Sequence, residues 1–239
     1  MRKGIILAGG SGTRLHPLTL GASKQLMPVY DKPLVFYPLS TLMLAGIREI
    51  LIISTPQDLS RFRVVLGDGT QLGLSLTYAE QPRPEGLAQA FLIGREFVGK
   101  DASVLILGDN IFQLVIADSA KAFEQQRDGA RIILKDVEDP QRFGVPVFED
   151  GKIVRIEEKP GTPKSKYAVV GVYFYDHTVF DVIKTLKPSE RGELEISDVN
   201  NYYIQAGKMT YDVMKGWWTD AGTFESLLRA NNLVANSRL

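Results

Sequence analysis

Short runs of Ile, Leu and Val alternate along the chain with amphipathic stretches, and each run ends in Gly, Ser, Asp or Pro. This alternation predicts strands that take turns with helices, as in layered α/β proteins. Consecutive positions are apolar in each strand candidate, so we expect strands buried on both faces, as parallel strands are. The strand candidates are residues 3–9, 49–54 and 103–109, and the helix candidates between them are residues 33–46, 58–66 and 86–99.

The second half of the chain has a stronger β pattern. Asp-Gly, Pro-Gly and similar turn signals separate its apolar runs, which predicts a smaller antiparallel lobe. These runs cover residues 130–135, 143–150, 151–159 and 167–176, and helical patterns return at residues 178–186, 196–207 and 223–236. No Pro-, Ser- or Gly-rich linker is long enough to divide the chain, so residues 1–239 are expected to form one domain with two lobes.

The composition excludes several classes of protein. Of the 239 residues 44% are hydrophobic and 23% charged, which suits a substantial core. The 28 basic and 28 acidic residues give a formal net charge of zero, which argues against a general nucleic-acid binder. The absence of Cys excludes a disulfide scaffold and fits a reducing compartment, so a cytoplasmic protein is expected. With no run of about 20 apolar residues and no signal-peptide pattern, we expect no membrane partner.

A glycine-rich loop, LAGGSGTRL at residues 7–15, follows the first predicted strand. Gly9, Gly10 and Gly12 would let backbone amides approach phosphate oxygens, and Arg14 adds a planar fork of donors that suits phosphate. The loop matches neither the dinucleotide fingerprint nor the P-loop, whose Gly-Lys-Ser/Thr is missing. Glycine clustering by itself is equally compatible with an ordinary turn between a strand and a helix.

Longer blocks follow one another in a specific order. The first two are LAGGSGTRLHPLT, from residue 7, and SKQLMPVYDKPLVFYPLSTLMLAGI, from residue 23. The later ones are EQPRPEGLAQAF (80–91), LGDN (107–110), RFGV (142–145), EEKP (157–160), YAVVGVYFYD (167–176), RGELEISDVN (191–200) and WTDAGT (218–223). In this order the blocks resemble those of the sugar nucleotidyltransferases, most closely the glucose-1-phosphate thymidylyltransferases. The resemblance covers nearly the whole chain.

The resemblance implies the nucleotide-diphospho-sugar transferase fold: a Rossmann-like, mostly parallel mixed sheet flanked by helices, with a smaller antiparallel β lobe for the sugar phosphate. It implies nucleotide binding by about residues 1–130 and sugar-phosphate binding by about residues 131–239. The implied reaction joins dTTP to α-D-glucose 1-phosphate, with Mg²⁺, and gives dTDP-glucose and pyrophosphate. Because a phosphate dianion is a competent nucleophile, no general base is needed, and catalysis depends on positioning and charge neutralisation.

The resemblance also implies which residues contact the nucleotide. Arg14 would hold the triphosphate, and Lys24 would neutralise charge at the reacting phosphates. The amide of Gln81 offers both a donor and an acceptor to the edge of a pyrimidine, and Gly86 would let the backbone close over the base. The full nucleotide set is Ala8, Gly9, Gly10, Gly12, Thr13, Gln25, Gln81 and Gly86.

On the sugar side, the resemblance implies that Lys159 binds the phosphate and Glu158 the sugar hydroxyls, with backbone contacts from Gly144 and Val169. Taken alone, this charge run would more often be a solvated surface. Asp109 ends the third predicted strand, at the edge where open α/β sheets bind ligands. Together with Asp220 it would form an oxygen shell suited to Mg²⁺. The implied catalytic residues are Arg14, Lys24, Asp109 and Lys159.

The sequence departs from the family in three ways. It ends at Leu239, before the helical tail that typical members use for subunit contacts and a secondary nucleotide site, so a short form that still self-associates is expected. Phe143 stands where Tyr is common, and the segment after LGDN differs. Both changes concern the sugar site. UTP or another hexose 1-phosphate therefore stays open, as does a non-catalytic regulator that binds nucleotide sugars, although the retained Arg14, Lys24, Asp109 and Asp220 argue against the latter.

Overall fold

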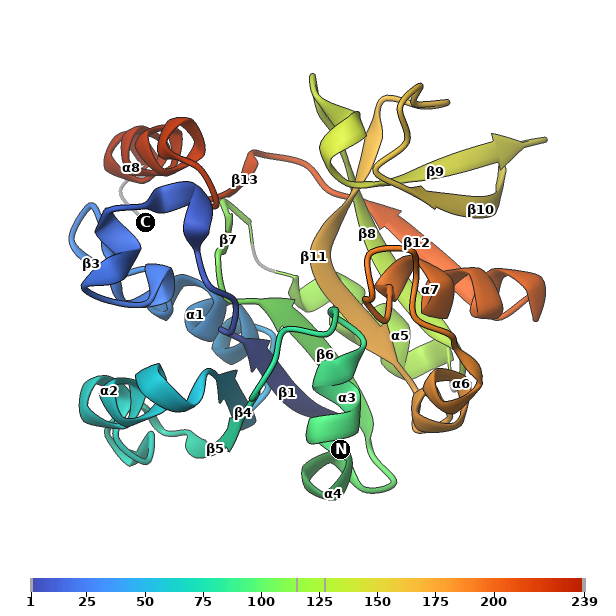
Figure 1. Ribbon diagram of the computed structural model, residues 1–239. Coiled ribbons are helices and arrows are strands. Elements are labelled where there is room, and N and C mark those ends of the chain that lie inside the picture. The colour runs from blue at the N-terminus through green and yellow to red at the C-terminus, as the bar shows by residue number, and fades with distance from the viewer. Residues whose placement is uncertain (1, 115, 127, 238–239) are drawn as a thin grey trace. The chain divides into compact units, whose positions relative to one another are not determined.

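The computed structural model describes residues 2–114, 116–126 and 128–237 (Figure 1). Its contacts divide the chain into two compact units that are interleaved along the sequence. The glycine-loop unit contains Arg2–Arg83, Leu105–Asp118 and Gly216–Leu239. The Glu158 unit contains Pro84–Val104 and Ser119–Lys215. Neither unit is a continuous half of the chain.

The main sheet has seven strands in the order β12-β8-β11-β6-β1-β4-β5. In the glycine-loop unit, β1 (Arg2–Leu7), β4 (Glu49–Ser54) and β5 (Ser75–Glu80) are parallel to one another. In the Glu158 unit, β8 (Ala130–Asp136) pairs antiparallel with β11 (Tyr167–Tyr175) and parallel with β12 (Met209–Val213). The division between the units falls within β6 (Ala102–Leu107), after Val104. The predicted mixed, mostly parallel sheet is confirmed.

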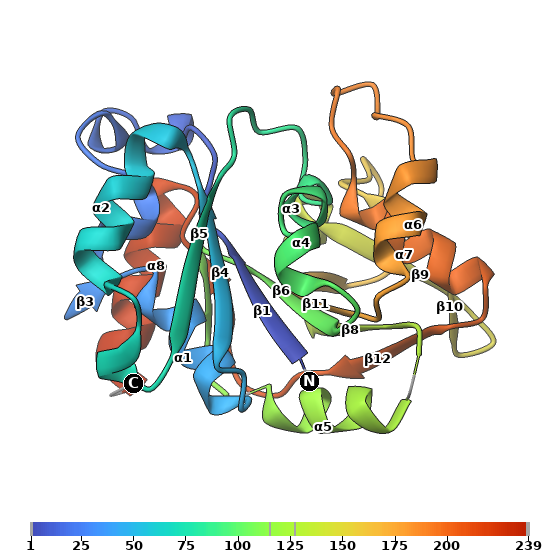
Figure 2. The same cartoon turned by 90° about the horizontal axis from the view of Figure 1, so that it is seen from below.

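The central strands of the glycine-loop unit contain successive apolar residues that are buried. Ile5 and Ile6 of β1 and Ile52 and Ile53 of β4 are fully buried, as expected for strands covered on both faces. Figure 2 shows α2 (Pro56–Leu66) running along β4 and β5, which it contacts. This helix begins after Thr55, whose hydroxyl accepts a hydrogen bond from an amide of the first turn. The helix α1 (Phe36–Leu44) packs against β1.

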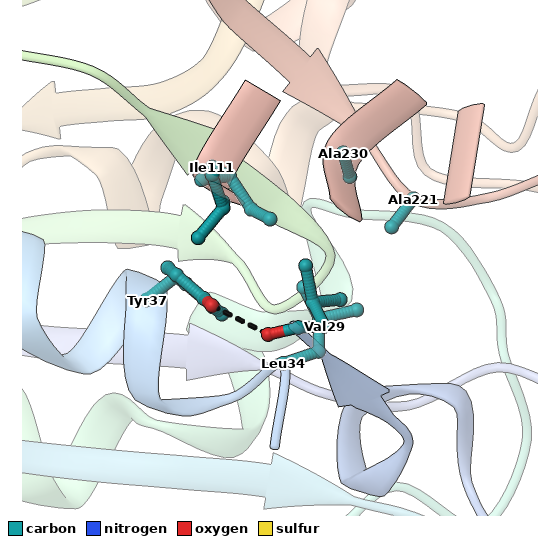
Figure 3. Close-up of a cluster of buried hydrophobic side chains, with 7 residues drawn as sticks. Val29, Leu34, Tyr37, Ile111, Ala221 and Ala230 are labelled. Atoms are coloured by element: carbon teal, nitrogen blue, oxygen red, sulfur yellow. Dashed lines mark hydrogen bonds between the residues drawn. The ribbon is translucent and has the colours of Figure 1, made fainter. Parts of the chain in front are cut away.

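A hydrophobic cluster joins distant segments of the same unit (Figure 3). The Tyr37 hydroxyl donates to the Val29 carbonyl over 2.6 Å, which holds α1 on the hairpin of β2 (Pro28–Val29) and β3 (Lys32–Pro33). The cluster also includes Ile111 of β7 (Asn110–Phe112) and Ala230 of α8 (Phe224–Ser237). It therefore stabilises the place where β7 pairs with β13 (Trp218–Asp220).

The Glu158 unit contains the antiparallel lobe that the turn signals predict. β9 (Gly144–Glu149) and β10 (Lys152–Glu158) form a two-stranded sheet, and α7 (Ile196–Gln205) packs against β10. The remaining helices are α3 (Gln89–Ile93), α4 (Arg95–Val98), α5 (Ala117–Gln126) and α6 (Val179–Thr185). Short 3-10 turns cover Thr13–Leu15, Leu18–Leu20, Lys24–Leu26, Thr70–Leu72 and Pro140–Arg142.

Several predicted boundaries are wrong. The helix predicted at residues 86–99 is two short helices that meet at Gly94, because glycine is a poor helix former. The predicted strands 3–9 and 103–109 end at Leu7 and Leu107, because the residues that follow turn away as loops. The sequence patterns missed β2, β3, β5, β7, α5, β12 and β13. Among the described residues, none of the helices combines the length and apolar character that crossing a bilayer requires.

Candidate active site

The glycine-rich loop follows β1, and hydrogen bonds to β4 hold Ala8 in place. The Ala8 amide donates to the Ile53 carbonyl over 2.7 Å, and the Ser54 hydroxyl donates to the Ala8 carbonyl over 3.0 Å. Farther along, Gly10 and Gly12 have φ values of +98° and +59°, in the left-handed region that favours glycine. The sequence therefore forms a loop whose start is anchored and whose path only glycine adopts at low cost.

Gln81 lies directly against this loop. It follows β5, where its amide donates to the Ser54 carbonyl over 2.7 Å, and its side chain is buried at 4% exposure. A methyl group on Gly9 would lie only 2.1 Å from Gln81 Oε1. Glycine at position 9 therefore makes room for the Gln81 carboxamide, and the structure brings these two predicted nucleotide residues together.

Gln25, another predicted nucleotide residue, is almost fully buried. Its Oε1 accepts a hydrogen bond of 2.6 Å from the Ser23 hydroxyl, and its carbonyl accepts one of 2.8 Å from the Val35 amide. A methyl group on Gly108 would lie 3.1 Å from Gln25 Cγ, so this side chain packs beside the residue that precedes Asp109. Gln25 thus has a packing role next to the end of β6.

Asp109 is the centre of a short chain of polar contacts. The Lys24 ammonium donates to Asp109 Oδ2, and Asn110 Nδ2 donates to Asp109 Oδ1 over 2.8 Å. Trp218 Nε1 donates in turn to Asn110 Oδ1 over 2.7 Å. Both oxygens of the carboxylate are thus oriented by neighbours from separate segments. The structure brings Lys24 and Asp109 together.

The electrostatics of Asp109 follow from this arrangement. Burial alone would raise the pKa of Asp109, but the Lys24 ammonium and the Asn110 amide outweigh burial and hold the pKa below the ordinary value of an aspartate. Asp109 is therefore ionised at neutral pH. An ionised, partly desolvated carboxylate attracts cations strongly because little water screens it.

Asp220 reaches the same place through strand pairing. Asp220 of β13 lies opposite Asn110 of β7, and the Ala221 amide donates to the Asp109 carbonyl over 2.9 Å. The two predicted metal ligands are thus held on adjacent backbone segments. The backbone of Asp220 therefore lies beside that of Asp109, and the assignment of both residues as metal ligands stays a prediction.

Arg14 joins this group from the glycine-rich loop, within the 3-10 turn that begins at Thr13. A methyl group on Gly222 would lie 2.9 Å from Asp220 Oδ2 and 3.2 Å from Arg14 Nη2. The carboxylate and the guanidinium therefore flank the same glycine. Arg229 Nη2 lies 3.9 Å from Asp220 Oδ1, a second basic group that the sequence analysis did not single out.

The donor set fits a magnesium ion that shares its shell with a ligand. Within the described part of the chain, no group of three or more His, Cys, Asp or Glu side chains is placed to hold a metal by itself. Mg²⁺ commonly takes only one or two carboxylates and completes its octahedron with phosphate oxygens and water. Asp109 and Asp220 provide two hard oxygen donors of this kind, beside a loop with a basic side chain.

The predicted sugar residues gather in the Glu158 unit, where β10 pairs with β9 so that Glu158 lies opposite Gly144. The Ser197 hydroxyl donates to Glu158 Oε2 over 2.6 Å. A methyl group on Gly144 would lie 3.2 Å from Ser197 Oγ and 3.6 Å from Glu158 Oε2, so glycine keeps this corner open. Ser197 was missed by the sequence analysis, although it belongs to the RGELEISDVN block.

Lys159 follows Glu158 in a left-handed backbone conformation, with φ of +44°. Its amide donates to the Phe143 carbonyl over 3.0 Å, and its Nζ lies 3.5 Å from Glu158 Oε1. Val169 lies on β11, which packs against β9, just before the β11–β8 register shifts. Gly144, Glu158 and Lys159 therefore share one corner, and Val169 lies on a neighbouring strand.

Gly86 has φ of +103° and lies against the backbone of Leu194, where a methyl group would come within 2.4 Å of the carbonyl oxygen. The Leu194 amide donates to the Glu85 carbonyl over 2.8 Å, and the Ala88 amide donates to the Leu194 carbonyl over 3.2 Å. The structure thus gives this predicted nucleotide residue a close backbone contact within the Glu158 unit.

Arg191 is the charged residue near Glu158 that the sequence analysis did not assign. Its Nη2 lies 3.7 Å from Glu158 Oε1 and 2.8 Å from both carboxylate oxygens of Glu195. In the sequence, the contact is indicated only by the spacing of Arg191 and Glu195, which lie four positions apart in RGELEISDVN. Ion pairs on helix surfaces have the same spacing.

Known proteins are similar to this chain over nearly its whole length. A family model described as nucleotidyl transferase matches residues 3–237. A glucose-1-phosphate thymidylyltransferase of Mycolicibacterium smegmatis is 56% identical over 241 residues, which cover 99% of this chain and 83% of that protein. The protein of the same name from Neisseria meningitidis serogroup A is 54% identical and covers 97% of this chain and 82% of its own length.

Solved structures agree with these relatives. A crystal structure from Bacillus anthracis, described as a glucose-1-phosphate thymidylyltransferase in complex with sucrose, has a TM-score of 0.94 and 48% identity, and covers 98% of this chain and 95% of that one. A UDP-glucose pyrophosphorylase complexed with UDP-glucose has a TM-score of 0.86 at 24% identity and covers 100% of both chains, so it shares the fold.

Proposed function

The chain belongs to the nucleotidyl transferase family, and on this basis we propose that it joins dTTP to α-D-glucose 1-phosphate, giving dTDP-glucose and pyrophosphate. Relatives at 56% and 54% identity bear the name glucose-1-phosphate thymidylyltransferase, which supports both substrates. The observation that carries the proposal is the convergence of Lys24, Asp109 and Asp220 from three separate segments. The half-buried Lys24 ammonium, paired with Asp109, suits charge neutralisation at a phosphate.

In the proposed reaction, a phosphate oxygen of the sugar 1-phosphate forms a bond to the α-phosphorus of dTTP. The bond from that phosphorus to the oxygen bridging to the β-phosphate breaks, and pyrophosphate leaves. Arg14 and Lys24 neutralise charge on the triphosphate, and Lys159 holds the attacking phosphate. Since that phosphate is already nucleophilic, the residues act by positioning and charge, and we assign no general base.

We propose Mg²⁺ as the metal, with Asp109 and Asp220 as its protein ligands. Bound there, the ion would withdraw charge from the reacting phosphate as a Lewis acid. The oxygen character of the two carboxylates and the low pKa of Asp109 support this assignment, because a metal ligand must be deprotonated.

For the base, we propose that the carboxamide of Gln81 pairs with N3–H and O4 of the pyrimidine, a role supported by its burial against Gly9. Gly86 is proposed to bring its backbone close to the base. The remaining proposed nucleotide contacts come from Ala8, Gly10, Gly12, Thr13 and Gln25. For the sugar, we propose that Glu158 accepts hydrogen bonds from the hydroxyls, with Gly144 and Val169 as backbone contacts and Arg191 as a further cation.

The test is pyrophosphate release from a panel of triphosphates and hexose 1-phosphates. We expect the highest kcat/KM with dTTP and glucose 1-phosphate. A higher kcat/KM with UTP or another hexose 1-phosphate would keep the reaction class and change the substrate. Binding of dTDP-glucose without pyrophosphate release from any pair would instead support the nucleotide-sugar-binding regulator and refute the proposed enzyme.

We further propose that the chain works in the cytoplasm as a homo-oligomer. The absence of Cys supports a reducing compartment, and the half-exposed Phe224 and Leu228 of α8 support contact with a second copy. Light scattering after size exclusion measures the assembly, and a mass equal to one chain at micromolar concentration would refute self-association.

A further inference from the structure

A buried carboxylate in the Glu158 unit has no role in the reaction described so far. Glu195 is only 8% exposed and occupies the N-cap position of α7. Helices favour short polar residues at this position, because their oxygen atoms accept hydrogen bonds from free amides of the first turn. The Glu195 side chain makes no such capping bond. Its burial therefore serves something other than the helix end.

The partner of this carboxylate is Arg191. Arg191 Nε and Nη2 donate to Glu195 Oε1 over 3.2 and 2.8 Å, and Nη2 also donates to Oε2 over 2.8 Å. The Ser189 hydroxyl donates to Oε1 over 2.7 Å. These bonds satisfy a carboxylate that would otherwise be costly to bury. They also fix the plane of the guanidinium.

The contact leaves one edge of the guanidinium available. Glu195 accepts hydrogen bonds from the edge formed by Nε and Nη2. The ion pairs with Glu158 and Glu193 also involve Nη2, and Arg191 Nη1 forms no hydrogen bond or ion pair with another described residue. An arginine can bind a carboxylate on one edge and a phosphate on the other, since its five N–H groups form a rigid fork. Arg191 Nη2 lies 3.7 Å from Glu158 Oε1, so the fixed guanidinium stands beside the proposed sugar residue.

The backbone around Glu195 is held more firmly than the arginine that it contacts. The amide and the carbonyl of Leu194 are hydrogen-bonded to Glu85 and Ala88, respectively. The Ser189 amide donates a hydrogen bond to the Glu193 carbonyl over 2.9 Å. The Arg191 side chain, in contrast, is 42% exposed. Long exposed side chains lose rotamer entropy when a ligand immobilises them, and a partner that orders them beforehand removes part of that cost.

We propose that Glu195 is the positioning residue of Arg191: it fixes the guanidinium beside Glu158 so that the Nη1 edge meets the phosphate of the sugar 1-phosphate. This inference rests on the proposed function. We expect the ordering to affect glucose 1-phosphate, because the proposed contacts of dTTP other than Gly86 lie in the glycine-loop unit.

The test compares Glu195→Gln with Glu193→Gln, a matched control. The Glu193 carboxylate also lies near Arg191 Nη2, at 3.4 Å, but its side chain is 38% exposed and forms this one ion pair among the described residues. We expect Glu195→Gln to raise KM for glucose 1-phosphate about tenfold, as loss of a charge-assisted hydrogen bond does, with KM for dTTP unchanged. Glu193→Gln should change neither KM by more than about twofold.

A double-mutant cycle with Arg191→Lys separates positioning from a general structural effect. If Glu195 acts through the guanidinium, Glu195→Gln should cost little more once Arg191 is a lysine, which lacks the fork. An equal cost on both backgrounds, or an equal rise of both KM values, would overturn the inference. Should Glu195→Gln fail to fold, Ser189→Ala tests the same orientation and should raise only KM for glucose 1-phosphate, by a few-fold.

The outcomes also separate this inference from the proposed function. If the wild-type chain releases no pyrophosphate from any pair, the proposed function fails. Calorimetric binding of glucose 1-phosphate to the wild type and to Glu195→Gln then decides the inference on its own. If the wild type is active and Glu195→Gln behaves like Glu193→Gln, the function stands and the positioning role of Glu195 is refuted.

Discussion

Replacing Gly86 with Ala tests how firmly two loops of the Glu158 unit are joined. A methyl group at this position would lie 2.4 Å from the Leu194 carbonyl oxygen and 2.5 Å from its amide nitrogen. Backbone atoms cannot swing aside as the end of a side chain can. The substitution must therefore separate residues 84–88 from Leu194 and break the hydrogen bonds that Leu194 makes with Glu85 and Ala88.

The expected loss has two sources. The φ of +103° at Gly86 is strained for any residue with a Cβ atom, which costs about 1–3 kcal/mol. Moving two backbone segments apart to relieve the collision costs about 1–3 kcal/mol more. We therefore expect Gly86→Ala to lower the free energy of unfolding by about 2–6 kcal/mol.

Gly192→Ala is the matched control, because it lies in the same loop system and separates the two sources. Gly192 has φ of +73°, and no atom lies within 4 Å of a methyl group placed there. It should lose only the backbone strain, about 1–2 kcal/mol. Urea unfolding followed by circular dichroism measures both variants against the wild type, with the m-value as a check on the states compared.

The reasoning fails if Gly86→Ala loses no more stability than Gly192→Ala at the same m-value. That result would mean that the contact between Gly86 and Leu194 yields without cost. A larger loss for Gly86→Ala should be accompanied by a higher KM for dTTP, because Gly86 is a proposed contact of the base. It should also raise the KM for glucose 1-phosphate, because Leu194 immediately precedes Glu195.

Three further predictions concern the glycine-loop unit. Asp109→Asn should lower turnover by about a hundredfold or more with the fold intact, because a metal-ligand charge is lost. Pyrophosphate release at saturating Mg²⁺ measures the turnover, and Asp181→Asn, at an exposed aspartate, is the control. Near-normal turnover of Asp109→Asn would contradict the role of Asp109. Gly9→Ala should displace the Gln81 carboxamide, because the methyl group would lie 2.1 Å from Gln81 Oε1. It should lower the dTTP-to-CTP ratio of kcat/KM as Gln81→Ala does, because cytosine lacks the N3–H and O4 with which Gln81 is proposed to pair; an unchanged ratio in either variant would count against base recognition by Gln81. Lys24→Met should leave the buried Asp109 unpaired and cost about 3 kcal/mol at neutral pH. The pKa of Asp109 is low only while Lys24 outweighs burial, so this pKa should rise in the variant. The loss of stability should therefore shrink as the pH falls toward 4, because the carboxylate becomes protonated. Urea unfolding at neutral pH and near pH 4 measures the loss, and a loss independent of pH would refute the prediction.

Local patterns predicted most of the fold because the central strands contain runs of consecutive apolar residues. The run EILIIS at residues 49–54 predicts β4 with its observed bounds, since its four central residues are all apolar and are buried on both faces of the sheet. The edge strand β5 has only one buried position among its six residues and carries a weaker signal. The strands β7 and β13 have three residues each, too few for any periodicity.

The candidate site was accessible to the sequence only as a resemblance. Lys24, Asp109 and Asp220 are unremarkable singly, and each could be a cap, a turn or a surface charge. Their convergence depends on hydrogen bonds such as the one from Trp218 to Asn110, which joins positions 108 residues apart. No local pattern records a contact at that separation. Arg191 and Glu195 were missed because they precede the predicted helix at residues 196–207, in a segment without a periodic pattern.

The sequence by itself determined the α/β class, the glycine-rich loop after the first strand and the order of the blocks, because these follow from which side chains neighbour one another along the chain. Only the tertiary structure decided that β13 pairs with β7, that Gln81 fits against Gly9, and that Glu195 is used for an arginine rather than for a helix end. These contacts depend on segments that meet when the core closes. Burial fixes their side chains, and burial is a property of the folded chain rather than of any stretch within it.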